Sequence, residues 1–111
     1  MEHMEFKDVV AIAKDVRASY HIFETKFAGK PWSREQIAQG FVGDVGDLMK
    51  LIMAKEGIRA IDDVDAKLAH ELSDCLWSIL VLADKYGIDL ESEFTKNMQE
   101  LKAHIDAKNA A

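Results

Sequence analysis

Two pairs of acidic residues stand out in this 111-residue sequence because of their spacing. Asp44 and Asp47 are three residues apart, and so are Glu71 and Asp74. Residues three apart in an α-helix share a face, so each pair would present two carboxylates side by side. Convergent carboxylate oxygens are typical ligands of hard divalent cations such as Mg²⁺ or Mn²⁺. The four acids together therefore form a candidate metal site.

The position of Asp44 on its helix favours a bound ligand. On a helical wheel Asp44 falls between Leu48 and Leu51, inside the apolar stripe of its segment, and Asp47 lies at the edge of that stripe. A carboxylate on a buried face is costly unless a cation or a hydrogen-bond donor compensates it. A metal ion or a basic side chain is therefore expected beside Asp44.

Structural explanations of the acid pairs stay open at this point. The chain has 20 acidic residues, so pairs spaced i,i+3 are common and most of them face water. For Glu71 and Asp74 taken alone, a solvated helix face is the simpler interpretation. Salt bridges from Lys50 or Lys67 would also satisfy the acids without a metal.

Four helical segments are expected to position these residues. Apolar residues recur at helical spacing, a capping-box pattern joins Ser33 to Gln36, and glycine or proline residues separate the segments. The expected helices run from about residue 4 to the low twenties, from Ser33 as N-cap to about Lys55, from Asp62 or Asp63 to about Tyr86, and from Leu90, capped by Asp89, to about Ala107. The sequence predicts an all-α, four-helix bundle-like fold in a single domain, residues 1–111.

Two features of the middle helices indicate close packing. Gly40, Gly43 and Gly46 recur every three residues, which would let another helix or a ligand approach the backbone; helix packing is the favoured explanation. The second half of the third segment is apolar almost all round, as in a helix at the centre of a bundle or at a subunit interface.

Composition narrows the class of protein. A formal charge of -6 argues against binding nucleic-acid polymers through their backbones, but not against a nucleotide held through a metal. Cys75 is the only cysteine, in an apolar run that predicts a packed thiol. No signal-peptide pattern is visible, and the longest apolar run, 79–83, is far shorter than a membrane span. We expect a soluble cytoplasmic protein.

The segment Gly40-Phe41-Val42-Gly43-Asp44-Val45-Gly46-Asp47-Leu48, followed by His70-Glu71-Leu72-Ser73-Asp74, resembles the MazG-like nucleotide pyrophosphohydrolases. That family, related to the all-α dimeric dUTPases, carries Glu-Glu-x-x-Glu on one helix and Glu-x-x-Asp on the next. The likeness extends from about residue 33 to 101 and includes the stretch 82–90. It implies a MazG-type domain completed by oligomerisation, as a homodimer or a homotetramer.

The resemblance also implies a reaction. Asp44, Asp47, Glu71 and Asp74 match the positions that bind Mg²⁺ in the family and serve catalysis. The implied activity is hydrolysis of a nucleoside triphosphate to the monophosphate and pyrophosphate, with nucleotide-pool cleansing as one expected role.

Further residues would bind the substrate. Lys96 and Asn97 fall where the family tends to have a basic and amide pair near the phosphates, although both suit the surface of the last helix equally well. Trp32, Phe23 or Phe27 would contact the base, whereas an aromatic residue in so short a helical chain is more often part of the core.

Departures from the family pattern favour metal binding over catalysis. Gly43 stands where the family has its first glutamate, and Asp44 and Asp47 are shorter than the two glutamates that follow it. Loss of the first acid would remove a second metal or the group that activates water. A catalytically weak or inactive nucleotide- or metal-binding homologue is therefore the alternative, and a purely structural helical oligomer is a third hypothesis.

Overall fold

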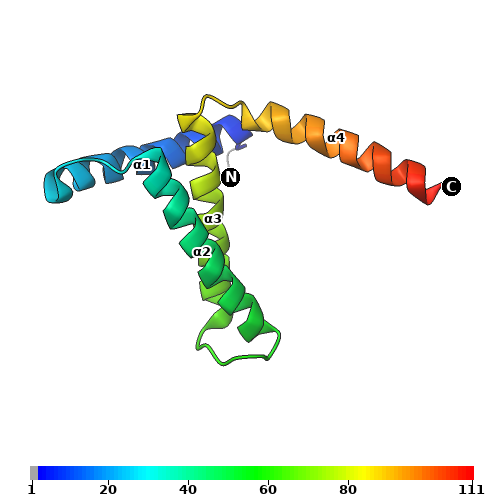
Figure 1. The fold of residues 1–111 in the computed structure, drawn as a ribbon, viewed down its shortest axis with the longest axis horizontal. Coiled ribbons are helices and arrows are strands. Elements are labelled where there is room, and N and C mark those ends of the chain that lie inside the picture. Colours follow the sequence, from blue (N-terminus) through cyan, green and yellow to red (C-terminus); the bar gives the residue numbers. More distant parts are fainter. Residues whose placement is uncertain (1–2) are drawn as a thin grey trace.

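The structure is a computed structural model that describes residues 3–111, and within this range it consists of four α-helices and no strand (Figure 1). The helices are α1 (Phe6–Ala28), α2 (Arg34–Lys55), α3 (Val64–Lys85) and α4 (Leu90–Asn109). The predicted all-α, bundle-like fold with four helices is confirmed. Its first three helices pack together, whereas the fourth extends away from them.

The helix boundaries follow the capping signals of the sequence. The Ser33 side chain accepts a hydrogen bond from the backbone N–H of Gln36, and the Gln36 side chain accepts one from the backbone N–H of Ser33. The predicted capping box is therefore confirmed. Asp89 accepts a hydrogen bond from the amide of Ser92 at the start of α4. Gly57 and Gly87 follow the ends of α2 and α3 with φ of 81° and 67°, which glycine adopts without steric cost.

One expectation about the ends was wrong. The first helix does not stop in the low twenties, because no helix-breaking residue precedes Gly29, whose left-handed backbone ends α1. The predicted N-cap position of α3 is confirmed at Asp63, whose backbone is left-handed with φ of 56° and whose side chain makes no capping hydrogen bond to the helix.

The α2 and α3 helices form an antiparallel hairpin, and α1 crosses one end of it (Figure 1). Two contacts of Trp77 hold α1 against α3. The Trp77 indole N–H donates to the carbonyl of Ala13 at 3.1 Å, and its ring lies 5.7 Å from that of Tyr20. The buried apolar residues are few, and none belongs to α4; they are Ala13, Ile37, Leu51, Cys75, Leu80, Val81 and Ala83.

The fourth helix leaves the other three at the C-terminal end of α3, the end of the hairpin that α1 crosses (Figure 1). None of its residues is buried, and it packs extensively against no other helix of residues 3–111. Its predicted apolar stripe is present but faces solvent in the single chain. Among the described residues, no helix has the length and apolar content needed to cross a membrane.

Candidate metal centre

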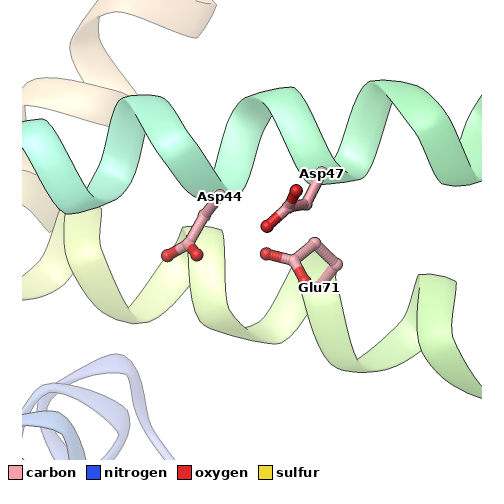
Figure 2. Close-up of side chains that lie close together, drawn as sticks. All are labelled: Asp44, Asp47 and Glu71. Carbon is pink, nitrogen blue, oxygen red and sulfur yellow. The ribbon is translucent and has the colours of Figure 1, made fainter.

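Three of the four predicted acids meet between α2 and α3. Asp44 and Asp47 project from α2 toward Glu71 of α3 (Figure 2). One carboxylate oxygen from each residue lies within 4.8 Å of the others. The three-residue spacing on α2 places two carboxylates on the face that the hairpin turns toward α3. A small cation could contact all three side chains from this position.

The surroundings of Glu71 are unfavourable for an isolated negative charge. Burial raises the pKa of Glu71 above its usual value, and the negative charges of Asp44 and Asp74 raise it further. Its Oε1 atom is buried and has no hydrogen-bond partner among the described residues. A buried acceptor without a donor costs free energy that a bound cation would recover. The residues therefore fit a divalent cation with oxygen ligands.

The lysines that might have neutralised the acids do not pair with them. Within residues 3–111, neither Lys50 nor Lys67 forms an ion pair with Asp47 or Glu71. Both lysines instead line a shallow hollow of about 390 Å³ beside these two acids. Among the described residues, salt bridges from these two lysines therefore do not explain the position of the acids.

Asp74, the fourth predicted acid, lies outside the cluster of three. Its Oδ2 atom is 3.2 Å from Nε2 of His70, one turn earlier on α3. It lines a cavity that Asp44 also lines and that none of the lysines reaches, whereas Lys50 and Lys67 line the separate hollow with Asp47 and Glu71. Asp44 therefore borders both the three-acid cluster and this cavity.

The cavity lies between α1 and the α2–α3 hairpin and has a volume of about 550 Å³. Such a volume is within the range of small-molecule sites in proteins. Three aromatic residues line it, Tyr20, Trp32 and Trp77. The cavity thus joins flat apolar surfaces to the carboxylate of Asp44.

A buried ion pair lines one part of this cavity. Arg17 and Glu24 lie seven residues apart on one face of α1, and they are 6% and 7% exposed. Two guanidinium nitrogens of Arg17 donate hydrogen bonds to the two carboxylate oxygens of Glu24. Glu24 also accepts from the backbone N–H of Trp32 at 2.7 Å. The hydrogen bond from Arg17 lowers the pKa of Glu24, against the effect of its burial. Together these bonds fix Trp32 beside α2.

Sequence reasoning missed Arg17 and Glu24. The only signal available was their seven-residue separation, which puts both on one helix face with Ala13 and Tyr20. Charged residues at such spacing usually lie on solvated surfaces. Their burial depends on the crossing of α1 over the hairpin, which the sequence pattern does not specify.

Of the residues predicted to bind the substrate, Trp32 lies at the cavity, whereas Lys96 and Asn97 do not. Trp32 lines the cavity, where its ring would lie 3.2 Å from a Cβ at Gly40. Lys96 and Asn97 are exposed on α4 and line neither this cavity nor the hollow beside Asp47.

The other two aromatic residues predicted to contact the base, Phe23 and Phe27, do not line the cavity. Phe23 and Phe27 are exposed and lie against each other, with ring centroids 4.8 Å apart.

A Cβ at Gly43 or Gly46 would meet no atom within 4 Å, so in the single chain only Gly40 supports a close approach.

Cys75 is a buried free thiol behind the acids. Its burial raises its pKa, and the charges of Asp44 and Glu71 add to this effect. The thiol therefore stays protonated near neutral pH and is a poor nucleophile.

Comparisons with models of protein families, with curated proteins and with solved structures found no match to this chain.

Proposed function

We propose that this protein is a Mg²⁺-dependent nucleoside triphosphate pyrophosphohydrolase of the MazG-like kind, with Mn²⁺ as the alternative metal. One observation carries the proposal: one carboxylate oxygen from each of three acids on two helices lies within 4.8 Å of the others, and a buried oxygen of Glu71 has no hydrogen-bond partner in the described part of the chain. The resemblance in the segments 40–48 and 70–74 supports the choice of reaction. The family's oligomeric assembly is part of the proposal.

Each part of the site has a role in this reaction. Asp44, Asp47 and Glu71 would hold the cation, and Asp74 lies one turn along α3 at the edge of the cavity. When bound, Mg²⁺ neutralises charge on phosphate oxygens and favours attack by water. Water would form a bond to the α-phosphorus as the bond to the bridging oxygen breaks, releasing pyrophosphate and the monophosphate.

The surroundings of the acids suggest how the substrate lies. The aromatic cavity on one side of Asp44 suits a base, because Trp32 and Trp77 offer faces on which a planar ring stacks. Lys50 and Lys67, which line the hollow beside Asp47 and Glu71, would provide positive charge for the terminal phosphates. The substrate would then run from the cavity, across the acids, to the lysines.

A non-catalytic nucleotide- or metal-binding protein is the second candidate. The observation in its favour is Gly43, where the family motif has a glutamate and where a Cβ would meet open space. Among residues 3–111, and apart from the chain neighbours of Gly43, no side chain comes within 4 Å of this Cβ position to replace the missing acid. Metal binding would then remain without rapid turnover.

Pyrophosphate release tests the proposal. Canonical and modified nucleoside triphosphates are incubated with the protein and Mg²⁺ or Mn²⁺, and the assay is repeated with Asp44→Asn and Glu71→Gln. We expect release to fall by about a hundredfold or more in both variants, because each loses a charged ligand of the cation. Glu100→Gln, an exposed change on α4, is the matched control and should retain the wild-type rate.

The outcome also separates the two candidates. Release no faster than that of the two site variants would reject the enzyme. Calorimetry then decides what remains: saturable, metal-dependent nucleotide binding supports the binding protein, and no binding of either metal or nucleotide rejects both candidates.

A further inference from the structure

Two contacts hold Trp32 at the wall of the cavity. Its backbone N–H donates to Oε1 of Glu24 at 2.7 Å, so the connection between α1 and α2 is tied to α1 at this residue. Its indole ring lies against α2, because a Cβ at Gly40 would be 3.2 Å from a ring carbon. Trp32 is therefore attached to α1 through its backbone and to α2 through its ring.

The carboxylate that accepts from Trp32 is itself fixed. Glu24 is buried, and both of its carboxylate oxygens accept hydrogen bonds from the guanidinium group of Arg17. Such a two-pronged pair sets the orientation of the carboxylate, which a single hydrogen bond would leave free to rotate. A buried ion pair adds little net stability, because removing both charges from water costs about as much as their attraction contributes. What this pair supplies to Trp32 is a fixed acceptor.

The second tryptophan of the cavity is held in a comparable way. Trp77 donates its indole N–H to the carbonyl of Ala13, and its ring lies 5.7 Å from that of Tyr20. None of the contacts that hold the two indoles involves a member of the three-acid cluster. The aromatic walls are thus in place without a cation.

A wall that is ordered in advance lowers the cost of binding a planar ring, because less freedom is lost when the ring stacks. Aromatic faces bind nucleobases by stacking, which requires neither phosphate nor metal. We propose that Glu24, held by Arg17, is a positioning residue: it keeps Trp32 in the cavity wall as the surface on which the base of the substrate stacks, so that base binding does not require the metal. This inference rests on the proposed function for its ligand, a nucleoside triphosphate.

Steady-state kinetics of the full chain test the positioning role. Glu24→Gln should raise the KM for the nucleoside triphosphate about tenfold and leave kcat within about twofold of the wild type, because a lost stacking surface weakens the substrate complex and the transition state equally. Gly40→Val should have the same effect without breaking the ion pair, since its side chain displaces the Trp32 ring. Gly46→Val, whose Cβ meets no atom within 4 Å, is the matched control and should keep the wild-type KM.

Calorimetry with nucleosides tests metal independence without turnover. The nucleosides of the canonical bases are titrated into the protein in EDTA, and at least one of them should bind saturably. Trp32→Ala should raise its dissociation constant about tenfold or more. Adding Gly40→Val to Trp32→Ala should cause no further loss, because Trp32 is the one side chain of residues 3–111, chain neighbours aside, within 4 Å of a Cβ at Gly40.

The outcomes separate this inference from the proposed function. Nucleoside binding that follows this pattern of variants, together with no pyrophosphate release, rejects the enzyme and supports the positioning role. Pyrophosphate release with an unchanged KM in folded Gly40→Val rejects the positioning role and leaves the enzyme. A wild-type protein that binds no nucleoside in EDTA overturns the inference, as does a Gly40→Val effect that persists when Trp32 is replaced by alanine. Since Gly40→Val leaves the buried pair intact, the test holds even where Glu24→Gln fails to fold.

Discussion

At the scale of single residues, Glu71 combines burial with negative neighbours. Its carboxylate is half-buried beside Asp44 and Asp47, and one of its oxygens has no hydrogen-bond donor within residues 3–111. Its pKa is raised, so the ionised form is less stable in the folded chain than in the unfolded one. The metal-free protein is therefore destabilised at neutral pH by the same group that would bind the metal.

Glu71→Gln should have opposite effects with and without metal. In metal-free buffer near neutral pH the variant should melt a few degrees above the wild type, since the amide removes a repelled charge and can donate to Asp44. Millimolar Mg²⁺ should raise the melting temperature of the wild type but not of the variant. Differential scanning calorimetry measures both effects, and Glu100→Gln serves as the control. A variant that Mg²⁺ stabilises as much as the wild type would remove Glu71 from the site.

The ion pair of Arg17 and Glu24 affects stability in the opposite direction from Glu71, because the pKa of Glu24 is lowered and that of Glu71 is raised. The pKa of Glu24 is lowered from 4.5, so the pair contributes its full stability above about pH 4.5 and loses it as the pH falls through the folded-state pKa. Removing one partner leaves the other buried and unpaired. Such a change costs about 3 kcal/mol or more in buried pairs.

Glu24→Gln should therefore lower the free energy of unfolding by about 3 kcal/mol near neutral pH. It should also weaken the loss of stability on acidification, because the titrating group is gone. Urea unfolding at neutral and acidic pH measures both. Asp106→Asn, which breaks the exposed pair with Lys102, should change stability by less than about 1 kcal/mol. Equal effects of the two substitutions would contradict the assigned role of the buried pair.

The residue pattern predicted part of this site. Asp44 inside an apolar stripe and Glu71 on a neighbouring helix were expected to share a ligand, and the structure brings their carboxylates together with that of Asp47. Arg17 and Glu24 were not expected, because the burial of charged residues depends on how helices cross. The sequence specifies faces of helices, whereas the crossing decides which faces become buried.

At the scale of helices, the ends were easier to predict than the packing. Local chemistry sets the ends: the Ser33–Gln36 capping box and the glycines at 57 and 87 act within a few residues. Packing depends on contacts between residues far apart in the sequence, such as the hydrogen bond from the Trp77 side chain to the backbone carbonyl of Ala13. The predicted helices were therefore nearly right, but the exposure of α4 was not foreseen.

The glycines of α2 offer a test at this scale. Gly43→Ala and Gly46→Ala should each stabilise the chain by roughly 0.5–1 kcal/mol, since alanine favours the helix and its Cβ meets no atom within 4 Å. Gly40→Ala should gain less or lose stability, because its Cβ would lie 3.2 Å from the Trp32 ring. Chemical denaturation compares the three. Equal gains at all three positions would mean that Trp32 moves without cost, and a loss at position 43 or 46 would mean that these glycines contact another copy.

At the scale of the whole molecule, few residues form the core. The buried apolar residues come from α1, α2 and α3, while large apolar side chains on all four helices remain exposed. A small core provides little stability, so burial of part of this exposed apolar surface would stabilise the folded chain. Assembly with a second copy would supply it and would couple stability to concentration.

The melting temperature of the wild type should therefore rise with protein concentration. Mass action favours the folded dimer over two unfolded chains as concentration increases. Leu101→Lys places a charge in the exposed apolar stripe of α4 and should melt at a lower temperature that does not depend on concentration. Ala103→Lys places the same charge on the opposite face of the helix and should behave as the wild type. Calorimetric scans over a wide range of dilution measure this dependence. A wild-type melting temperature that is constant on dilution would contradict it.

The cavity beside Asp44 has an optical consequence. The chain has two tryptophans, and both line this one cavity: Trp32 is fixed to α1 through Glu24, and Trp77 lies against Tyr20. The tryptophan fluorescence of the protein therefore comes entirely from residues that line this cavity. A planar ligand stacked there would quench or shift that emission, so titration without any label would follow its entry in the native chain.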